Sequence, residues 1–281
     1  MKIDLHMHTF FSDGGKSVQE IFDIARENGV KVVSITDHNN VDAYKNLDRV
    51  NRYGIKVIQG IEIDTVFEKT NIHIVMYGFD LTGTIKKYLQ KAADFDRKDF
   101  LRMIKDCEKL NGIKLDKSAV KAFINDNQYF DKVRLNNLLV KLRFAPSPVE
   151  AFYKFTKIVE DKKRYQIDAK KLFKIAKKSG GQTFIAHPIK YLKDLKTVEQ
   201  LEQFILELKG FGLDGVEVYN NRQTAEQEVK LLDFARKNNL KISAGSDFHG
   251  KLGAKESKQI GAVLEKNIDS KLVSNDLLKM F

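Results

Sequence analysis

Two histidines near the start of the chain, His6 and His8, have a spacing that suits a shared ligand. They end a short apolar segment that is typical of a β-strand. In a strand, residues i and i+2 point to the same side, so both imidazoles can reach one object at the strand's end. Imidazole is the commonest protein ligand for metal ions. The pair therefore favours a metal site, although a single His-x-His pair is not specific.

The chain contains only six histidines, and their positions strengthen this interpretation. Five lie at or just after the end of a β-like apolar run, and His73 opens such a run. Histidines scattered over a surface or a core would not follow strand ends in this way. The five are His6, His8, His38, His187 and His249, and the carboxylates Asp13, Asp37, Glu62 and Asp247 occupy similar places.

Two of these carboxylates need separate interpretation. Glu62 lies inside an apolar strand, where an unpaired carboxylate is costly to bury. A metal ion or an arginine must compensate it, and no arginine is close in the sequence, so we favour a metal. For Asp37 two roles stay open: a metal-site residue, or a carboxylate that accepts hydrogen bonds from a loop backbone or orients His38.

The composition is that of an ordinary globular protein, with 42% hydrophobic and 31% charged residues. No apolar run approaches the roughly 18 residues of a transmembrane helix, and no leader is expected at the N-terminus. The single cysteine, Cys107, cannot form an internal disulfide and lies in a helical pattern, where we expect it to be a buried apolar filler. These features predict a cytoplasmic protein without membrane contact.

Repeated strand and helix patterns must position the chemical residues. Seven strands are expected, with an eighth at 260–264, and most of them are separated by helices. Repeated βα units of this number predict an α/β fold that closes into a parallel, TIM-like barrel, whose C-terminal strand ends carry the chemistry. The first seven strands are expected at 2–5, 31–36, 55–63, 72–77, 182–186, 215–219 and 241–245.

The rhythm changes between residues 86 and 165, where no β-like alternation appears. We interpret 86–165 as an inserted all-helical subdomain, and 1–85 with 166–281 as the barrel. The insert holds 20 Lys+Arg and 11 Asp+Glu, a net charge of +9 within a chain of net charge +11. This charge has two interpretations, solvated helix faces or a surface that attracts phosphate or nucleic acid. Helical patterns within the insert are expected at 86–111, 116–125, 134–143 and 148–158.

Taken together, these motifs resemble the PHP (polymerase and histidinol phosphatase) family. The resemblance implies a distorted (β/α)7 barrel with a polynuclear metal site. The insert is similar to that of the stand-alone TrpH-like members, which are linked to phosphate removal from nucleoside 3′,5′-bisphosphates and to 5′-to-3′ trimming of short RNA. The matching pieces are His6-x-His8, Ser12-Asp13-Gly14, Thr36-Asp37-His38, Gly60-x-Glu62, His73, Ala186-His187-Pro188 and Gly245-Ser-Asp247-x-His249.

The resemblance also implies how the ligands are shared among two to three divalent ions, which would be Mn²⁺, Zn²⁺ or Fe²⁺. One site would use His6, His8, Glu62 and Asp247. A second would use Glu62, His73 and His187, with Glu62 bridging, and a third Asp13, His38 and His249. Among these residues we assign catalytic roles to Asp13, His38, Glu62 and His249.

The insert is the expected source of substrate contacts, with Arg134 as the candidate. TrpH-like proteins place an arginine in a Thr-Arg-Pro-His-like context, and Arg134 matches it, since a guanidinium suits bidentate phosphate binding. Leu135 and Asn136 stand where that context has Pro-His, which weakens the transfer of substrate preference. The alternative is an ordinary solvated helix residue.

The predicted function is a metal-dependent phosphoesterase that uses a metal-activated water on nucleoside 3′,5′-bisphosphates or on the 5′ ends of short RNA. No obligate protein partner is evident. One alternative is a histidinol-phosphate phosphatase, against which the Ser12-Asp13-Gly14 motif and the insert argue. Another is a non-catalytic, metal-containing nucleic-acid-binding module. A non-catalytic module should have lost several of the metal ligands, and none is lost here. The chain also shows no aromatic-rich motif on which the bases of single-stranded RNA could stack.

Overall fold

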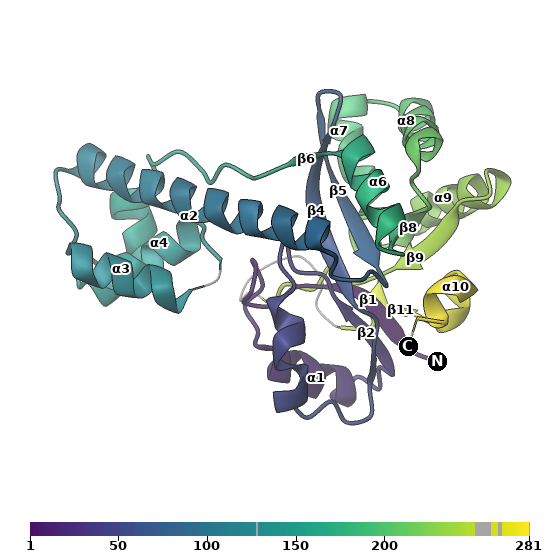
Figure 1. Ribbon diagram of the computed structural model, residues 1–281, viewed down its shortest axis with the longest axis horizontal. Coiled ribbons are helices and arrows are strands. Elements are labelled where there is room, and N and C mark those ends of the chain that lie inside the picture. The colour runs from purple at the N-terminus through teal and green to yellow at the C-terminus, as the bar shows by residue number, and fades with distance from the viewer. Residues whose placement is uncertain (128, 251–259, 264–265, 281) are drawn as a thin grey trace. The chain divides into compact units, whose positions relative to one another are not determined.

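The computed structural model of the chain describes residues 1–127, 129–250, 260–263 and 266–280 (Figure 1). The chain forms two compact units. The first unit comprises Met1–Lys86 and Gln166–Phe281, and the second unit is Lys87–Tyr165. The first unit combines strands with helices, so the predicted α/β class is confirmed.

The chain enters the first unit through a parallel three-stranded sheet. Its strands are β1 (Ile3–Met7), β2 (Val32–Ile35) and β3 (Lys56–Val57), in that order. Between β1 and β2 runs α1 (Val18–Glu27), which begins with the capping box that Ser17 and Glu20 form. The apolar face of α1 packs against β2, and the main chain from β1 leads directly into the histidine-bearing loop.

A second sheet has six strands and mixed direction, in the order β6-β4-β5-β7-β8-β9. The prediction of an all-parallel arrangement is wrong for β5, which runs antiparallel to both of its neighbours, β4 and β7. Only Glu68 and Lys69 connect β4 with β5, and so short a connection can join only antiparallel neighbours. The strands are β4 (Gly60–Phe67), β5 (Thr70–Tyr77), β6 (Ile167–Asp168), β7 (Gln182–Ile185), β8 (Gly215–Tyr219) and β9 (Lys241–Ala244).

Backbone hydrogen bonds connect the two sheets on both sides of β1 and β2. After β9, Asp247 N donates to His6 O (2.9 Å) and Phe248 O accepts from His8 N (2.8 Å). After β2, Glu62 N donates to Thr36 O (3.2 Å), and Glu62 O accepts from Asn39 N (2.9 Å). The end of β1 therefore meets the segment after β9, and the segment after β2 meets the first residues of β4.

The helices of the first unit cover its sheets, with α6 and α9 packed on the six-stranded sheet (Figure 1). Residues Asp42–Arg49 form a 3-10 helix, and the Asn40 side chain accepts a hydrogen bond from Asp42 N (2.7 Å) at its start. The strand expected at 260–264 is β10 (Ala262–Val263), paired with β11 (Lys266–Asn267), and Leu264 lies outside the described residues. The other elements are α6 (Ala169–Lys178), the 3-10 turns Pro188–Tyr191 and Ser270–Leu272, α7 (Leu192–Leu195), α8 (Val198–Phe211), α9 (Ala225–Lys237) and α10 (Asn275–Leu278).

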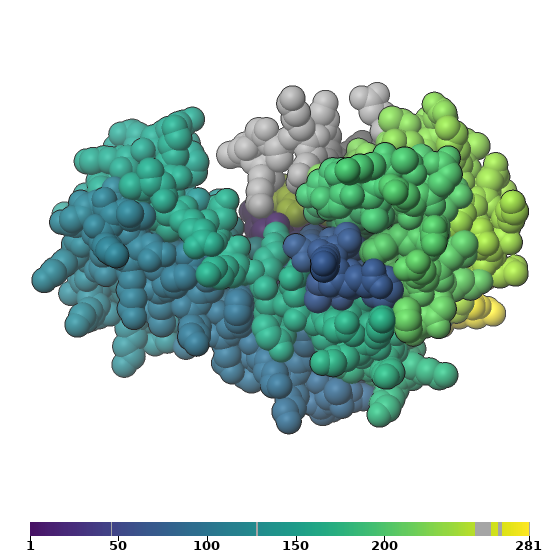
Figure 2. Space-filling model, turned by 90° about the horizontal axis from the view of Figure 1, so that it is seen from above, coloured from purple at the N-terminus to yellow at the C-terminus, as the bar shows by residue number. Residues whose placement is uncertain are grey.

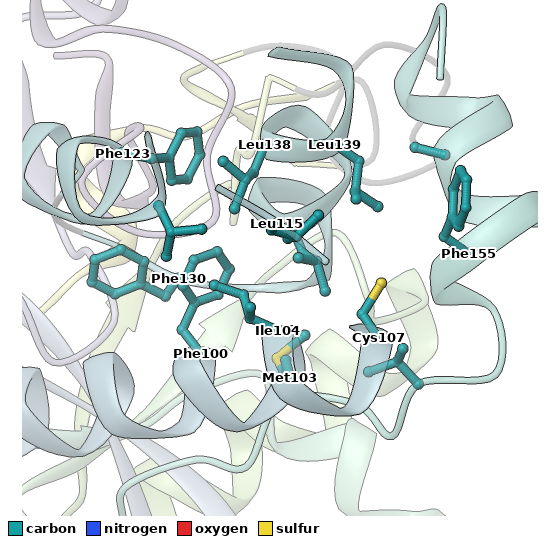
Figure 3. Close-up of a cluster of buried hydrophobic side chains, with 14 of the residues drawn as sticks. Phe100, Met103, Ile104, Cys107, Leu115, Phe123, Phe130, Leu138, Leu139 and Phe155 are labelled. Atoms are coloured by element: carbon teal, nitrogen blue, oxygen red, sulfur yellow. The ribbon is translucent and has the colours of Figure 1, made fainter. Parts of the chain in front are cut away.

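The second unit is helical in its described residues, which carry the blue and teal colours of the middle of the bar in Figure 2. Figure 3 shows Phe100, Ile104 and Cys107 pointing from α2 toward Leu138 and Leu139 of α4. Burial raises the pKa of the Cys107 thiol to about 11, as suits an apolar filler. The elements are α2 (Gly83–Asn111), which starts in the first unit, α3 (Lys117–Asp126), α4 (Lys132–Lys141) and α5 (Pro148–Ala151), which continues as a π-helical turn over Phe152–Thr156.

Within the described ranges, none of the helices is both long and apolar enough to cross a bilayer.

Candidate metal centre

His6 and His8 project from the end of β1 toward two carboxylates. His6 Nε2 lies 3.4 Å from Glu62 Oε2 and 3.4 Å from Asp247 Oδ1. His8 Nε2 lies 3.3 Å from each of the same two oxygens. All four side chains are buried and offer ligand atoms within 4.8 Å of one another. This is the same group that the family resemblance implied as one metal site.

Glu62 stands at the middle of a larger cluster of histidines. Its Oε1 contacts His73 Nδ1 (2.9 Å) and His187 Nε2 (3.0 Å), while its Oε2 lies 3.4 Å from His38 Nε2. The antiparallel direction of β5 (Thr70–Tyr77) explains why His73 lies in the first half of its strand, when the other histidines lie at or after the ends of theirs. Reversal of the strand brings its first residues to the edge where the parallel strands finish.

A further group forms where the loop after β1 meets the segment after β9. His249 Nε2 lies 3.3 Å from Asp13 Oδ1, and His8 Nδ1 lies 3.6 Å from the same oxygen. The rings of His8 and His249 are stacked at 4.3 Å. With His38, these residues bring their ligand atoms within 4.8 Å of one another.

All nine residues predicted as ligands thus lie in one cluster, although their grouping differs in part from the prediction. The group around Asp13 includes His8 as well as His38 and His249, and His38 joins Glu62 and His73 in another group. His187 contacts the cluster through Glu62. Arg134 belongs to the second unit, in the first turn of α4. The metal-binding role of the nine stays a prediction.

Asp37 holds the loop that carries Asp13. Its carboxylate accepts hydrogen bonds from Thr9 N (2.8 Å), Thr9 Oγ1 (2.6 Å) and Ser12 Oγ (2.5 Å). Of the two roles left open by the sequence, the hydrogen bonds favour the loop-binding one. Gly14 follows in the same loop, and a Cβ there would lie 2.5 Å from the carbonyl carbon and oxygen of His8, so this close approach requires glycine.

Glu217 is a site residue to which the sequence assigned no role. It lies on β8, fully buried, where Oε1 accepts from His6 Nδ1 (2.8 Å) and Oε2 accepts from His187 N (2.7 Å). A proton held on His6 Nδ1 leaves Nε2 as the nitrogen that faces Glu62 and Asp247. A carboxylate in the middle of an apolar strand was the available signal, as it was for Glu62.

Asp64 and Arg222 also belong to the site and were missed. Asp64 Oδ1 lies 3.3 Å from His73 Nε2, and Asp64 is next to Glu62 on the same face of β4. Arg222 Nε donates to Asp247 Oδ2 (3.1 Å), on the oxygen that the histidines do not contact. Only the position of Asn220-Asn221-Arg222 after β8 could have indicated Arg222.

The electrostatics of the cluster favour charged carboxylates. Burial alone would raise the pKa of Glu62 and Asp247, but the surrounding imidazoles outweigh it and hold both pKa values well below the usual range. Burial lowers the pKa of His8, but Asp247, Glu62 and Asp13 overcome this and raise it to about 10. In contrast, burial dominates at His187 and lowers its pKa to about 4.

Two buried nitrogens without hydrogen bonds in the described part of the chain indicate that the cluster suits a cation. His6 Nε2 and His8 Nε2 make no hydrogen bond to any of the described residues, although both are enclosed. Buried polar atoms are rarely left in this state, and an ion among these nitrogens and carboxylate oxygens would satisfy both. Mixed imidazole and carboxylate ligands suit divalent transition metals. The residues present therefore fit such ions.

The fold and the site together define an α/β protein with a buried histidine–carboxylate centre suited to metal ions. The PHP domain family matches residues 4–239. A 5′-3′ exoribonuclease of Haemophilus influenzae is 30% identical over 281 residues, covering 95% of this chain and 94% of its own. A 3′,5′-nucleoside bisphosphate phosphatase of Chromobacterium violaceum is 24% identical, with coverages of 88% and 87%. The chain belongs to the PHP domain family.

A solved structure supports the same fold. The crystal structure of a Bifidobacterium adolescentis protein, assigned as a metal-dependent phosphoesterase, matches with a TM-score of 0.75 at 22% identity. The match covers 99% of this chain and 96% of that chain. The family match over residues 4–239 confirms the resemblance to the PHP family that the motifs predicted.

Proposed function

We propose that the protein is a metal-dependent phosphoester hydrolase acting on the 5′ ends of short RNA or on nucleoside 3′,5′-bisphosphates. The observation that carries the proposal is Glu62, one buried carboxylate in contact with five histidines. Such a carboxylate suits a bridge between ions. We infer two to three ions of Mn²⁺, Zn²⁺ or Fe²⁺, held by the nine residues of the cluster.

The relatives support a phosphoester substrate. The Haemophilus protein is named for 5′-3′ exoribonuclease activity and the Chromobacterium protein for 3′,5′-nucleoside bisphosphate phosphatase activity. Both names describe hydrolysis of a phosphoester on a nucleotide, and this chain spans nearly all of both proteins. We therefore place its substrate in the same chemical class.

The residues of the cluster would have different roles in hydrolysis. Ions bound by the cluster would neutralise phosphate oxygens, lower the pKa of a water and stabilise the leaving oxygen. Asp13 and His73 each keep 15% of their side chain exposed, so a substrate would reach the cluster at these two residues. His249 Nδ1 donates to Asp247 O (2.8 Å), which leaves Nε2 to bind an ion or accept a proton. Asp13, His38, Glu62 and His249 are the proposed catalytic residues.

Arg134 is the proposed substrate-binding residue of the second unit, which we interpret as a substrate-facing cap. Asp131 caps α4 by accepting from Arg134 N (2.7 Å), so the arginine occupies the first turn of the helix. That turn is the positive end of the helix dipole, and a guanidinium there adds a fork suited to phosphate.

The test is hydrolysis by pure protein loaded with Mn²⁺, offered adenosine 3′,5′-bisphosphate, a 5′-phosphorylated RNA hexamer and histidinol phosphate. We expect release from one or both of the first two, and loss of at least ~100-fold in Asp247→Asn, because the variant removes a ligand charge. Asp233→Asn, an exposed position on α9, is the matched control. Hydrolysis of histidinol phosphate alone would contradict the assigned substrate, and no hydrolysis of any of the three would contradict the enzyme.

A further inference from the structure

A groove on the second unit lies away from the nine-residue cluster in the sequence and carries its own pattern of charge. It has a volume of about 540 Å³ and is lined by Phe95, Lys98, Leu101, Arg102, Lys105 and Lys163, among others. We propose that this groove binds single-stranded RNA. The inference rests on the proposed function in one respect, that the substrate is a nucleotide chain.

The groove follows one face of α2. Positions 95, 98, 102 and 105 are spaced by three or four residues, so they share a face of the helix. The opposite face carries Phe100, Ile104 and Cys107, which point into the apolar core of the second unit (Figure 3). Since the core fixes the rotation of α2, the groove residues keep their places without a ligand.

The acidic residues of the groove are already neutralised. Arg102 binds Asp99 through Nε (2.7 Å) and Asp106 through Nη1 (2.9 Å), and Asp99 also accepts from Lys163 N (2.9 Å). These contacts raise the pKa of Arg102, chiefly through its hydrogen bonds to Asp99. Both carboxylates therefore have partners within the second unit.

Three lysines remain without such partners. Lys98, Lys105 and Lys163 are exposed, and they form no ion pair with any residue in the described ranges. They stand at the groove of a unit whose net charge is strongly positive. Phosphate groups of a polyanion would neutralise them and release counterions.

The floor of the groove is apolar, and this property favours a single-stranded nucleic acid over a duplex. Leu101 is 39% exposed, and the half-buried Phe95 ring packs beside Tyr165 at 5.7 Å. Unpaired bases pack on apolar and aromatic surfaces while lysines follow the backbone, which is how single strands are bound without sequence preference. A duplex hides its bases and would leave Leu101 and Phe95 uncovered. The groove therefore favours a single strand.

Binding is measured by fluorescence anisotropy on the full-length protein, stripped of metal with EDTA, using a labelled 5′-phosphorylated 12-nucleotide RNA. The test variant is K98E/K105E/K163E. The matched control is K114E/K117E/K121E, which makes the same change in charge at exposed lysines of the second unit that do not line the groove.

We expect the groove variant to bind the RNA at least tenfold more weakly and the control less than twofold more weakly. Three lost phosphate contacts should also reduce the slope of log affinity against log salt by about 2. With Mn²⁺ restored, both variants should hydrolyse adenosine 3′,5′-bisphosphate at the wild-type rate, which shows that they are folded.

Equal weakening in both variants would mean that total charge, and not the groove, attracts RNA, and would overturn the inference. Unchanged binding in the groove variant would overturn it as well, and so would binding of a 12-base-pair duplex as tight as that of the single strand. Because binding is measured without metal, absence of hydrolysis in the wild type would contradict the proposed function and leave the binding result to be judged separately.

Discussion

A single side chain, Glu62, lies at the centre of the histidine–carboxylate cluster. One oxygen contacts His73 and His187, and the other faces His6, His8 and His38. An isolated carboxylate buried to this extent would be strongly destabilising, and the imidazoles around it lower its pKa instead. Cations that share this carboxylate would explain the arrangement, because each histidine would then bind an ion and not a proton.

Glu217 gives a prediction at the scale of one residue. Its two oxygens hold His6 Nδ1 and His187 N, so replacement by glutamine removes one of the two acceptors. We expect Glu217→Gln to weaken metal binding by about 10- to 100-fold, the usual cost of losing the partner that orients a ligand. Glu226→Gln, on the exposed side of α9, is the control.

Competition dialysis against a chelator measures both affinities. Wild-type affinity in Glu217→Gln would contradict an orienting role. A similar loss in Glu226→Gln would show that the change in overall charge, and not the orientation of His6, weakens binding.

The pKa of His8 predicts how metal binding depends on pH. A pKa raised to about 10 means that His8 carries a proton at neutral pH in the metal-free protein, while His187, with its pKa lowered to about 4, does not. An ion must displace the His8 proton, so affinity should rise with pH and binding should release protons. Calorimetry in buffers of different protonation enthalpy measures that release. An affinity independent of pH between 6 and 9 would contradict the prediction.

At the scale of elements, the sequence predicted where strands occur better than how they run. The loop after β1 and the helix that Ser17 caps follow from local signals. The reversed direction of β5 did not, because an apolar run looks the same in either direction and the two-residue turn at Glu68-Lys69 lacks glycine or proline. Asp64 was missed for a related reason, since its partner His73 meets it only once β5 is reversed.

Gly245 gives a prediction at this scale. It follows β9. A Cβ added to Gly245 would collide with the Cβ of His6 and would lie 2.5 Å from the backbone nitrogen of His6. We expect Gly245→Ala to destabilise the fold by about 1–3 kcal/mol, as overpacking does, and to lower metal occupancy by moving His6.

Gly210, inside α8, has no atom within 4 Å of an added Cβ. Gly210→Ala should therefore stabilise by about 0.5–1 kcal/mol through helix propensity. Thermal unfolding in EDTA compares the two variants with the wild type. Equal stability of Gly245→Ala and wild type would contradict the close approach of β9 to His6.

At the scale of the molecule, the sequence could identify the candidate ligands but not their neighbours. The nine residues were recognisable because histidine is rare in this chain and follows strand ends. Glu217 and Arg222 reach His6 and Asp247 from elsewhere on the chain, and no local pattern reports such contacts. The sharing of His8 and His38 between groups likewise depends on distances that only the folded chain sets.

The second unit has a core of its own and should fold alone. Among the described residues, sixteen buried side chains form this core. We expect a fragment of residues 83–165 to be helical and to unfold cooperatively. Leu138→Ala should destabilise it by about 2–5 kcal/mol, because it removes a fully buried side chain. Circular dichroism measures both properties, and a disordered spectrum would contradict the prediction.

The central claim is that Glu62 bridges ions that drive phosphoester hydrolysis, and Glu62→Gln tests it most directly because the shape is kept and the charge removed. The measurement is bound Mn²⁺ per chain, with nucleotide release from adenosine 3′,5′-bisphosphate and from a 5′-phosphorylated RNA in the same samples. We expect wild type to hold two or three ions and turn over, and the variant to lose at least one ion and at least ~100-fold in rate. Full metal content with unchanged turnover in Glu62→Gln would contradict the claim.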